Sequence, residues 1–240
     1  MATPEMQDTN DSDLDTQTNA SSSPSGAAGG VETAAEEIPA ENLMHGDGHA
    51  AIPQIPSITS DGSIEVDELS PADFEPDDLR QRLRTMMLSR RLDEKMMTLL
   101  KQGEGHFHIG CAGHEAVQSA LSRYSRPGEG PGHDWFCFYY RDLCMALSLG
   151  MTTKEALLAH LAKADDPNSG GRQMPEHFGL KHLNVMTTAS SVGAQFNPGV
   201  GFGVGIQQRG EDSYVYISCG DGATSPGDFH EALTWAAREP

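Results

Sequence analysis

The run SYVYISC at residues 213–219 breaks into Gly-Asp-Gly at 220–222, and a helix signature follows at once. Aromatic and β-branched residues with few charges are typical of a buried strand. Ser225 and Pro226 suit the N-cap and first position of a helix, which is predicted to run to the end of the chain. A strand that passes through a short glycine loop into a helix indicates an α/β fold, with a mostly parallel sheet flanked by helices.

A long amphipathic helix is predicted to begin at Pro76 and to stop at Gly103, with a cap from the aspartates at 77–78. Its apolar residues follow helical spacing and are expected to pack against the core. They are Leu79, Leu83, Met86, Met87, Leu92, Met96 and Leu100.

Two further stretches are predicted to be extended, DWFCFYYRD at 134–142 and the start of LNVMTTASSVGAQ at 183–195. Thr152 and Glu155 form a capping-box pattern before another helix. Residues 194–208 are also predicted to be helical despite their glycines, each of which costs a helix ~1 kcal/mol relative to alanine. Glycines are useful in a helix where another backbone approaches it closely. Such a close approach is therefore expected at Gly199, Gly201 and Gly203.

Charge is distributed very unevenly. Residues 1–79 contain no Lys or Arg and hold 18 of the 35 acidic residues, whereas the rest of the chain is nearly neutral. Residues 1–75 are therefore predicted to form a disordered acidic tail. No basic stripe with interleaved aromatics indicates nucleic-acid binding, and no apolar run of ~18 residues indicates a membrane span. The four cysteines lack disulfide or metal spacing, so a cytoplasmic protein with reduced thiols is expected.

Candidate ligand-binding residues follow the predicted strands. Asp221 lies on the loop from a strand into a helix, where α/β folds bind ligands. It is either a metal ligand or part of a tight turn. Tyr140 and Arg141 follow another strand, and arginine suits a diphosphate, although a surface arginine beside a half-buried tyrosine is the alternative.

Several histidines lie in or near the glycine loops. They are His106, His108, His114 and His177. Substrate contact and an ordinary loop role are both open for each of them, and their spacing is not that of a zinc site.

Five segments, in this order, resemble the α subunit of thiamine-diphosphate-dependent 2-oxo acid dehydrogenases, the E1 component. They are AGHEAVQSAL, HDWFCFYYRDLCMALSLGMT, DDPNSGGRQMPEHFG, TTASSVGAQ and YISCGDGATSPGDFHEAL. The form GGRQMPEHFG is more similar to branched-chain (2-oxoisovalerate) enzymes than to the animal pyruvate enzyme. AGHEAVQ also resembles bacterial chains in which α and β halves are fused. The fold that the resemblance implies is the thiamine-diphosphate-binding fold.

The resemblance implies roles for individual residues. Those expected to bind thiamine diphosphate are Tyr140, Arg141, Ser190, Val192, Gly220, Asp221, Gly222 and Ala223. Asp221 is in addition the expected Mg²⁺ ligand, and Phe107 and His108 are expected on the substrate side. The resemblance assigns no catalytic residue.

The implied reaction is oxidative decarboxylation of a 2-oxo acid, with a branched-chain substrate expected before pyruvate. The implied partners are an E1 β subunit or a fused β half, in a heterotetramer, and the lipoyl domain of the E2 acyltransferase, which accepts the acyl group. Residues 76–240 are expected to be the N-terminal part of the domain, truncated before its last strands, because the Asn-Asn pair that completes the family motif does not follow before Pro240. Two alternatives stay open: another thiamine enzyme of the transketolase or acetolactate synthase type, and an inactive truncated chain that only binds a partner.

Overall fold

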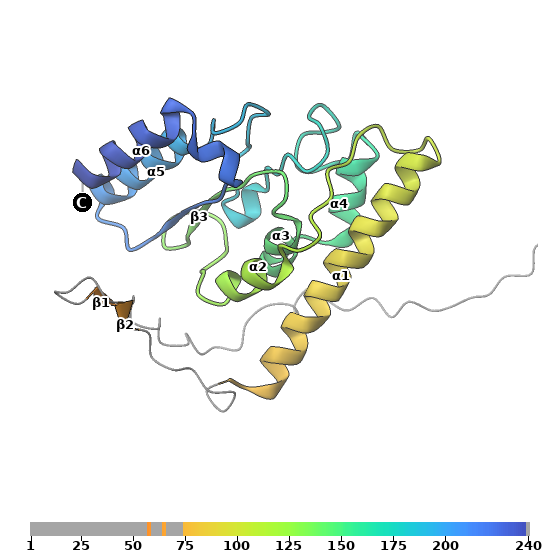
Figure 1. Cartoon of the computed structure of the whole chain (residues 1–240), viewed down its shortest axis with the longest axis horizontal. Helices are drawn as coiled ribbons and strands as arrows, with labels where there is room; N and C mark the ends of the chain where they lie inside the picture. The colour runs from red at the N-terminus through yellow and green to blue at the C-terminus, as the bar shows by residue number, and fades with distance from the viewer. Residues whose placement is uncertain (1–56, 59–63, 66–73, 239–240) are drawn as a thin grey trace, which may run out of the picture. The chain divides into compact units, whose positions relative to one another are not determined.

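The computed structural model describes residues 57–58, 64–65 and 74–238. The predicted tail at 1–75 lies largely outside these residues. Within it, the short strands β1 (Ser57–Ile58) and β2 (Ile64–Glu65) pair antiparallel. The rest of the described chain is rich in helices around a small parallel sheet (Figure 1), in agreement with the α/β prediction.

The parallel sheet consists of β3 (Trp135–Cys137) and β4 (Val215–Ile217), with Trp135 opposite Val215. The strand predicted at the start of 183–195 is reduced to one parallel bridge between Val185 and Phe136. The regular ladder ends there because a side chain takes over the pairing: the Thr188 hydroxyl donates to the carbonyl of Phe138 at 2.7 Å.

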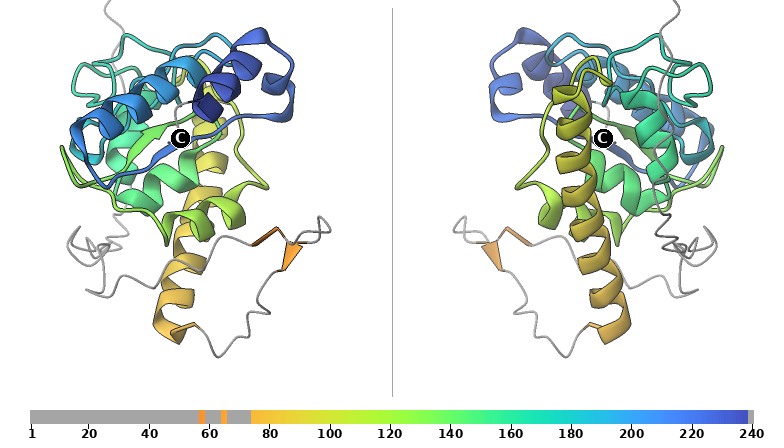
Figure 2. Two further views of the ribbon diagram at one scale, coloured as in Figure 1. Left: turned by 90° about the vertical axis from the view of Figure 1, so that its left-hand side faces the viewer. Right: turned by 90° about the vertical axis from the view of Figure 1, so that its right-hand side faces the viewer.

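Side chains alternate between the two faces of the sheet, as the pleat requires. On one face Phe136 and Phe138 enter the main core, which also contains Leu92 and Met96 of α1 (Pro76–Lys101) and nearly all of α3 (Leu143–Leu149). On the other face Cys137 and Ile217 meet α5 (Phe196–Arg209). The helix α6 (Gly227–Arg238) packs beside α5, as Figures 1 and 2 show.

The helix α1 has the predicted extent, and Gly103 follows its end with φ +80°. Its predicted cap is wrong: Glu75 occupies the N-cap, and the carboxylate of Asp78 instead pairs with Arg82 at 3.0 Å and with Arg123. Of the predicted apolar face, Leu92 and Met96 are buried, and Met86 and Leu100 are half-buried. In the first half Leu79, Leu83 and Met87 are exposed. The described residues thus supply a packing partner mainly to the C-terminal half of that face.

Three shorter helices complete the first half of the domain: α2 (Glu115–Ser122), α4 (Thr153–His160) and the 3-10 turn η3 (Lys181–Leu183). The capping box of α4 is confirmed, because the Glu155 N–H donates to the Thr152 hydroxyl at 3.2 Å and the Thr152 N–H donates to the Glu155 carboxylate at 2.7 Å. In the described part of the chain, every helix is too short or too polar to cross a bilayer.

The glycines of α5 differ from one another. A Cβ on Gly199 would lie 2.5 Å from the Ile217 side chain, so a close approach is present there, although to a side chain and not to a backbone. Gly201 and Gly203 have no described atom within 4 Å of such a Cβ, and the expected close approach is wrong at these two positions. The helix α6 begins at Gly227, one residue later than predicted, after the 3-10 turn η4 (Asp221–Thr224).

Candidate functional site

A cavity of about 370 Å³ lies at the carboxyl ends of β3 and β4. It is lined by the loops that follow the two strands and by the segment 188–193. Its lining includes every residue that the sequence assigned to cofactor binding: Tyr140, Arg141, Ser190, Val192, Gly220, Asp221, Gly222 and Ala223. The fold therefore brings these residues to one place, and their cofactor roles stay predictions.

Two charged side chains that line this cavity have no oppositely charged partner among the described residues. The guanidinium of Arg141 lies over the ring of Tyr140, 4.8 Å from its centroid, and forms no ion pair with the described residues. Asp221 is exposed, and within the described chain its carboxylate accepts no hydrogen bond. A free guanidinium suits a phosphate group, and a free carboxylate suits a hard divalent cation.

Gln118 of α2 fixes the backbone beside Arg141. Its amide N–H groups donate to the Arg141 carbonyl and to the Asp142 carboxylate, both at 2.9 Å. Its amide oxygen accepts the backbone N–H of Met145 at 3.2 Å. Gln118 is buried, so these bonds hold the loop after β3 against α2 and α3.

Asp142 joins the loops at the ends of the two strands. Its carboxylate accepts the backbone N–H of Tyr139 at 3.0 Å and the hydroxyl of Ser218, which follows β4. Burial raises the pKa of Asp142 to about 6, although the bonds from Ser218 and Tyr139 oppose the shift. Gln195 adds a second link by donating to the Ser218 carbonyl at 2.8 Å. The two cavity-lining loops are thus cross-linked by buried polar groups.

His177 lines the cavity and holds a predicted site residue. Its Nδ1 lies 3.1 Å from the Pro175 carbonyl, which can only accept, so Nδ1 carries a proton. Its Nε2 lies 2.9 Å from the Ser190 hydroxyl. In the neutral ring with the proton on Nδ1, Nε2 accepts a hydrogen bond from that hydroxyl. The imidazole therefore fixes the orientation of the Ser190 side chain.

The two residues predicted on the substrate side do not line this cavity. Phe107 is half-buried on the loop after α1. The ring of His108 is buried behind the cavity wall: its Nδ1 lies 2.8 Å from the Glu176 carboxylate and its Nε2 lies 3.0 Å from the Asp93 carboxylate. Glu176 itself lines the cavity, so His108 is one residue removed from it.

Reasoning from the sequence missed Gln118, Asp142, Glu176 and Ser218. Gln118 could have been recognised as a candidate, because it is an uncharged polar residue of a short helix and lies, with Ser119, on the face that packs against the core. Asp142 directly follows Arg141 in YYRD. The other two carried no local signal, since their roles depend on partners distant in the chain.

The chain is similar to known proteins over most of the residues from 83 onward. A family model described as "Dehydrogenase E1 component" matches residues 83–239. The chain is 40% identical over 158 residues to the 2-oxoisovalerate dehydrogenase subunit alpha of Bacillus subtilis (strain 168), an alignment that covers 64% of this chain and 46% of that protein.

Two other relatives show the same pattern. A Pseudomonas aeruginosa 2-oxoisovalerate dehydrogenase subunit alpha is 27% identical over 195 residues, 81% of this chain and 42% of that protein. The pyruvate dehydrogenase E1 component subunit alpha of Bacillus subtilis (strain 168) is 29% identical over 171 residues, 71% of this chain and 42% of that protein. The chain thus spans less than half the length of these relatives.

Proposed function

Because the chain belongs to the dehydrogenase E1 component family, as an α-type component, we propose that it provides the thiamine-diphosphate site of a 2-oxo acid dehydrogenase. The observation that carries the proposal is the single cavity lined by all the residues predicted to bind the cofactor. The cavity lies at the carboxyl ends of parallel strands, where α/β folds place their ligands.

The residues present fit such a cofactor. Arg141 offers a planar set of donors for the diphosphate, and Asp221 offers one carboxylate for a Mg²⁺ ion that diphosphate oxygens would also ligate. Gly222 leaves room for close approach, since a Cβ there would meet no described atom within 4 Å. Thiamine diphosphate, when bound, would supply the carbanion and the electron sink that decarboxylation of a 2-oxo acid requires.

The chain's own residues would bind and orient. Tyr140 and Arg141 would hold the diphosphate, and Asp221 the metal. Ser190, kept in place by His177, and Val192 would flank the rings of the cofactor. Gly222 and Ala223 would bring backbone N–H groups toward the diphosphate; that of Ala223 donates to the Gly220 carbonyl at 3.0 Å in this structure and would have to exchange that partner.

The proposed substrate is a branched-chain 2-oxo acid, with pyruvate second. The identity to the Bacillus subtilis 2-oxoisovalerate subunit, 40%, exceeds the 29% to the pyruvate subunit of the same organism, which supports this order. The proposed partners are an E1 β subunit and the lipoyl domain of an E2 acyltransferase. Phe107 remains proposed on the substrate side, where a β subunit would complete the site. His108, which is buried, would act on that side through Glu176, which lines the cavity.

Calorimetric titration with thiamine diphosphate and Mg²⁺, on the chain assembled with its β partner, tests the site. Arg141→Ala removes a charge-assisted contact of roughly 1.5–3 kcal/mol, so the affinity should fall ~10–150-fold. Arg84→Ala, which removes an exposed arginine of α1, is the matched control. Wild-type affinity in Arg141→Ala would reject the assignment.

Asp221→Asn tests the metal role separately. Asparagine suits a turn as well as aspartate does but lacks the charge, so a Mg²⁺ ligand predicts a higher Mg²⁺ concentration for half-maximal activity at unchanged fold stability. An unchanged Mg²⁺ requirement would make Asp221 an ordinary turn residue. Turnover with branched-chain 2-oxo acids and with pyruvate decides the substrate.

A further inference from the structure

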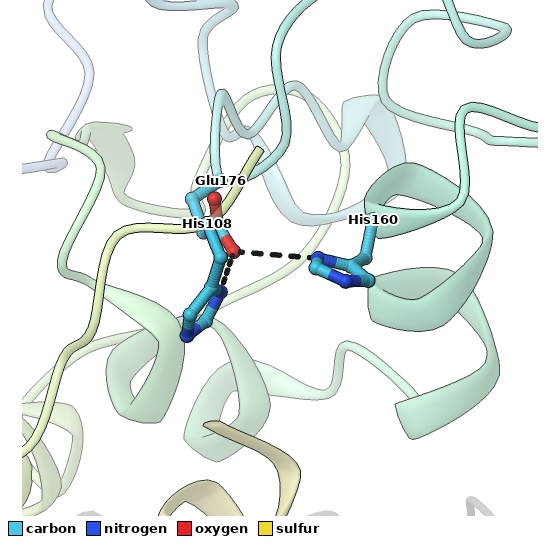
Figure 3. A group of neighbouring side chains, drawn as sticks. All are labelled: His108, His160 and Glu176. Carbon is cyan, nitrogen blue, oxygen red and sulfur yellow. Dashed lines mark hydrogen bonds and ion pairs between the residues drawn. The ribbon is translucent and has the colours of Figure 1, made fainter. Parts of the chain in front are cut away.

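A second cluster of metal-ligating side chains lies behind the cavity wall (Figure 3). His108 comes from the loop after α1, His160 from the last residue of α4, and Glu176 from the loop before η3. One oxygen of Glu176, Oε1, lies 2.8 Å from His108 Nδ1 and 4.0 Å from His160 Nδ1. One ligand atom of each residue therefore lies within 4.8 Å of the others.

The cluster is buried and only partly satisfied. The side chains are 0% (His160), 1% (His108) and 3% (Glu176) exposed. Both ring nitrogens of His160 and the Oε2 atom of Glu176 lack a hydrogen-bond partner of normal geometry among the described residues. The backbone of Met96 makes a weaker polar contact with the His160 side chain, and the backbone of Ile109 makes one with the Glu176 carboxylate. Buried polar atoms without partners are costly, at about 1–3 kcal/mol each, so these three atoms indicate a missing partner.

Only one nitrogen of His160 is free to reach a partner within the cluster. Gly105 packs against Nε2, since a Cβ built on that glycine would lie 2.5 Å from this atom. Nδ1 faces Glu176 instead (Figure 3).

His108 has the outer partner that a metal-bound histidine requires. Its Nε2 lies 3.0 Å from the Asp93 carboxylate, which also accepts the backbone N–H of Cys111 at 3.0 Å. A histidine that binds a metal through one nitrogen almost always donates the other N–H to a carboxylate or carbonyl. Asp93 would thus hold the Nε2 side of the ring, and Nδ1 is aimed at Glu176.

We propose that His108, His160 and Glu176 bind a divalent transition-metal ion of the Zn²⁺ class, through Nδ1 of each histidine and both carboxylate oxygens of Glu176. Ligands about 2.0–2.1 Å from a tetrahedral Zn²⁺ lie about 3.3 Å apart. The separations of Glu176 Oε1 from the two Nδ1 atoms, 2.8 and 4.0 Å, lie on either side of this value. The ligand atoms of the three residues spread over as much as 4.8 Å, so metal binding would draw the side chains together by up to about 1.5 Å. The two imidazoles and one carboxylate match the ligand types that Zn²⁺ prefers.

The charges around His108 suit a cation, which can be a proton on its ring or a divalent metal ion. Asp93 and Glu176 bring two carboxylates close to His108, and a 2+ ion between neutral imidazoles balances both. The competing arrangement is a protonated His108 that bridges the two carboxylates. It accounts for the bonds of His108 but, among the described residues, leaves the ring nitrogens of His160 and the Oε2 atom of Glu176 without a hydrogen bond of normal geometry. Because the site is closed to solvent, the role of the ion is structural: it would tie α4 to the loop of Glu176, which lines the cofactor cavity.

Equilibrium dialysis of the whole purified chain, first stripped with a chelator, tests the site with Zn²⁺ and Co²⁺. The titration omits thiamine diphosphate, so that no metal is held through a diphosphate. We expect about one ion per chain, and Co²⁺ bound there should show visible absorption without a thiolate charge-transfer band. Stoichiometry well below one, or a thiolate band, would overturn the proposal, because the chain's cysteines would then be the ligands or no site would exist.

Variants locate the site. His160→Gln should abolish this binding, whereas Asp93→Asn, which alters only the outer partner, should weaken it 10–100-fold and keep one ion per chain. His182→Gln, which removes an exposed histidine, is the matched control and should bind as the wild type does. Equal binding by His160→Gln and wild type would refute the assignment. If His160→Gln fails to fold by circular dichroism, the Asp93→Asn affinity and the Co²⁺ spectrum of the wild type decide.

Discussion

The substitution Asp142→Asn tests whether burial raises the pKa of the Asp142 carboxyl, which joins the loops that line the cavity. Burial raises the pKa of Asp142 from its ordinary 3.8 to about 6. A difference of this size corresponds to about 3 kcal/mol between the two protonation states. Because the folded-state pKa lies above that of the unfolded chain, the stability that Asp142 contributes is complete below pH 3.8 and is lost as the pH rises through about 6.

The expected pH dependence can be worked out from these two pKa values. Between pH 5 and pH 7.5 the contribution of Asp142 to the free energy of unfolding should fall by about 1.4 kcal/mol. Asparagine keeps one oxygen to accept from Tyr139 and Ser218, but its amide faces the amide of Gln118. That mismatch costs about one hydrogen bond, roughly 1 kcal/mol, at every pH.

Urea unfolding of both proteins at constant ionic strength from pH 5 to 7.5 separates the two effects. Other titrating groups are common to both, so they cancel in the difference. The wild type should lose about 1.4 kcal/mol relative to Asp142→Asn as the pH rises. A difference that stays the same at every pH, or that grows in favour of the wild type, would mean that the hydrogen-bond donors keep Asp142 ionised despite its burial.

Two further perturbations test packing and capping. Gly199→Ala places a methyl group 2.5 Å from the Ile217 side chain, and overpacking of this kind lowers the free energy of unfolding by about 1–3 kcal/mol. Gly201→Ala adds a methyl group in open space and should raise the free energy of unfolding by up to about 1 kcal/mol through helix propensity. Thermal melts of the two variants should shift in opposite directions, and equal shifts would reject the packing argument. Thr152→Ala removes the hydroxyl that accepts the Glu155 N–H. The free energy of unfolding measured in urea should fall by about 0.5–2 kcal/mol. An unchanged free energy of unfolding would mean that the α4 capping box does not stabilise the fold.

Patterns local to the sequence predicted much of this chain correctly. The membership of the E1 family, proposed from five segments, is confirmed by the family match over residues 83–239. The long helix to Lys101, the α4 capping box and the two strand segments β3 and β4 are present as expected. Each of these depends on residues adjacent in the chain or on a pattern that repeats along it, which is why the sequence alone reveals them.

Apart from the N-cap of α1 and the first residue of α6, the incorrect predictions concern what a segment meets in space. The glycines of α5 look alike in sequence, yet only Gly199 faces the sheet. Leu83 fits the apolar periodicity of α1 as well as Met96 does, yet it is exposed. Periodicity identifies a face of a helix, but the presence of a partner along its whole length depends on how the other elements pack.

The sequence determined which residues stand at the ends of strands, and so it identified Arg141 and Asp221. Only the tertiary structure decided that Asp142 is buried with a raised pKa, and that Glu176 brings His108 and His160 together. His108, His160 and Glu176 lie on separate elements, and no spacing along the chain relates them. Their chemistry depends on proximity and on removal from water, and both arise only when distant segments fold against one another.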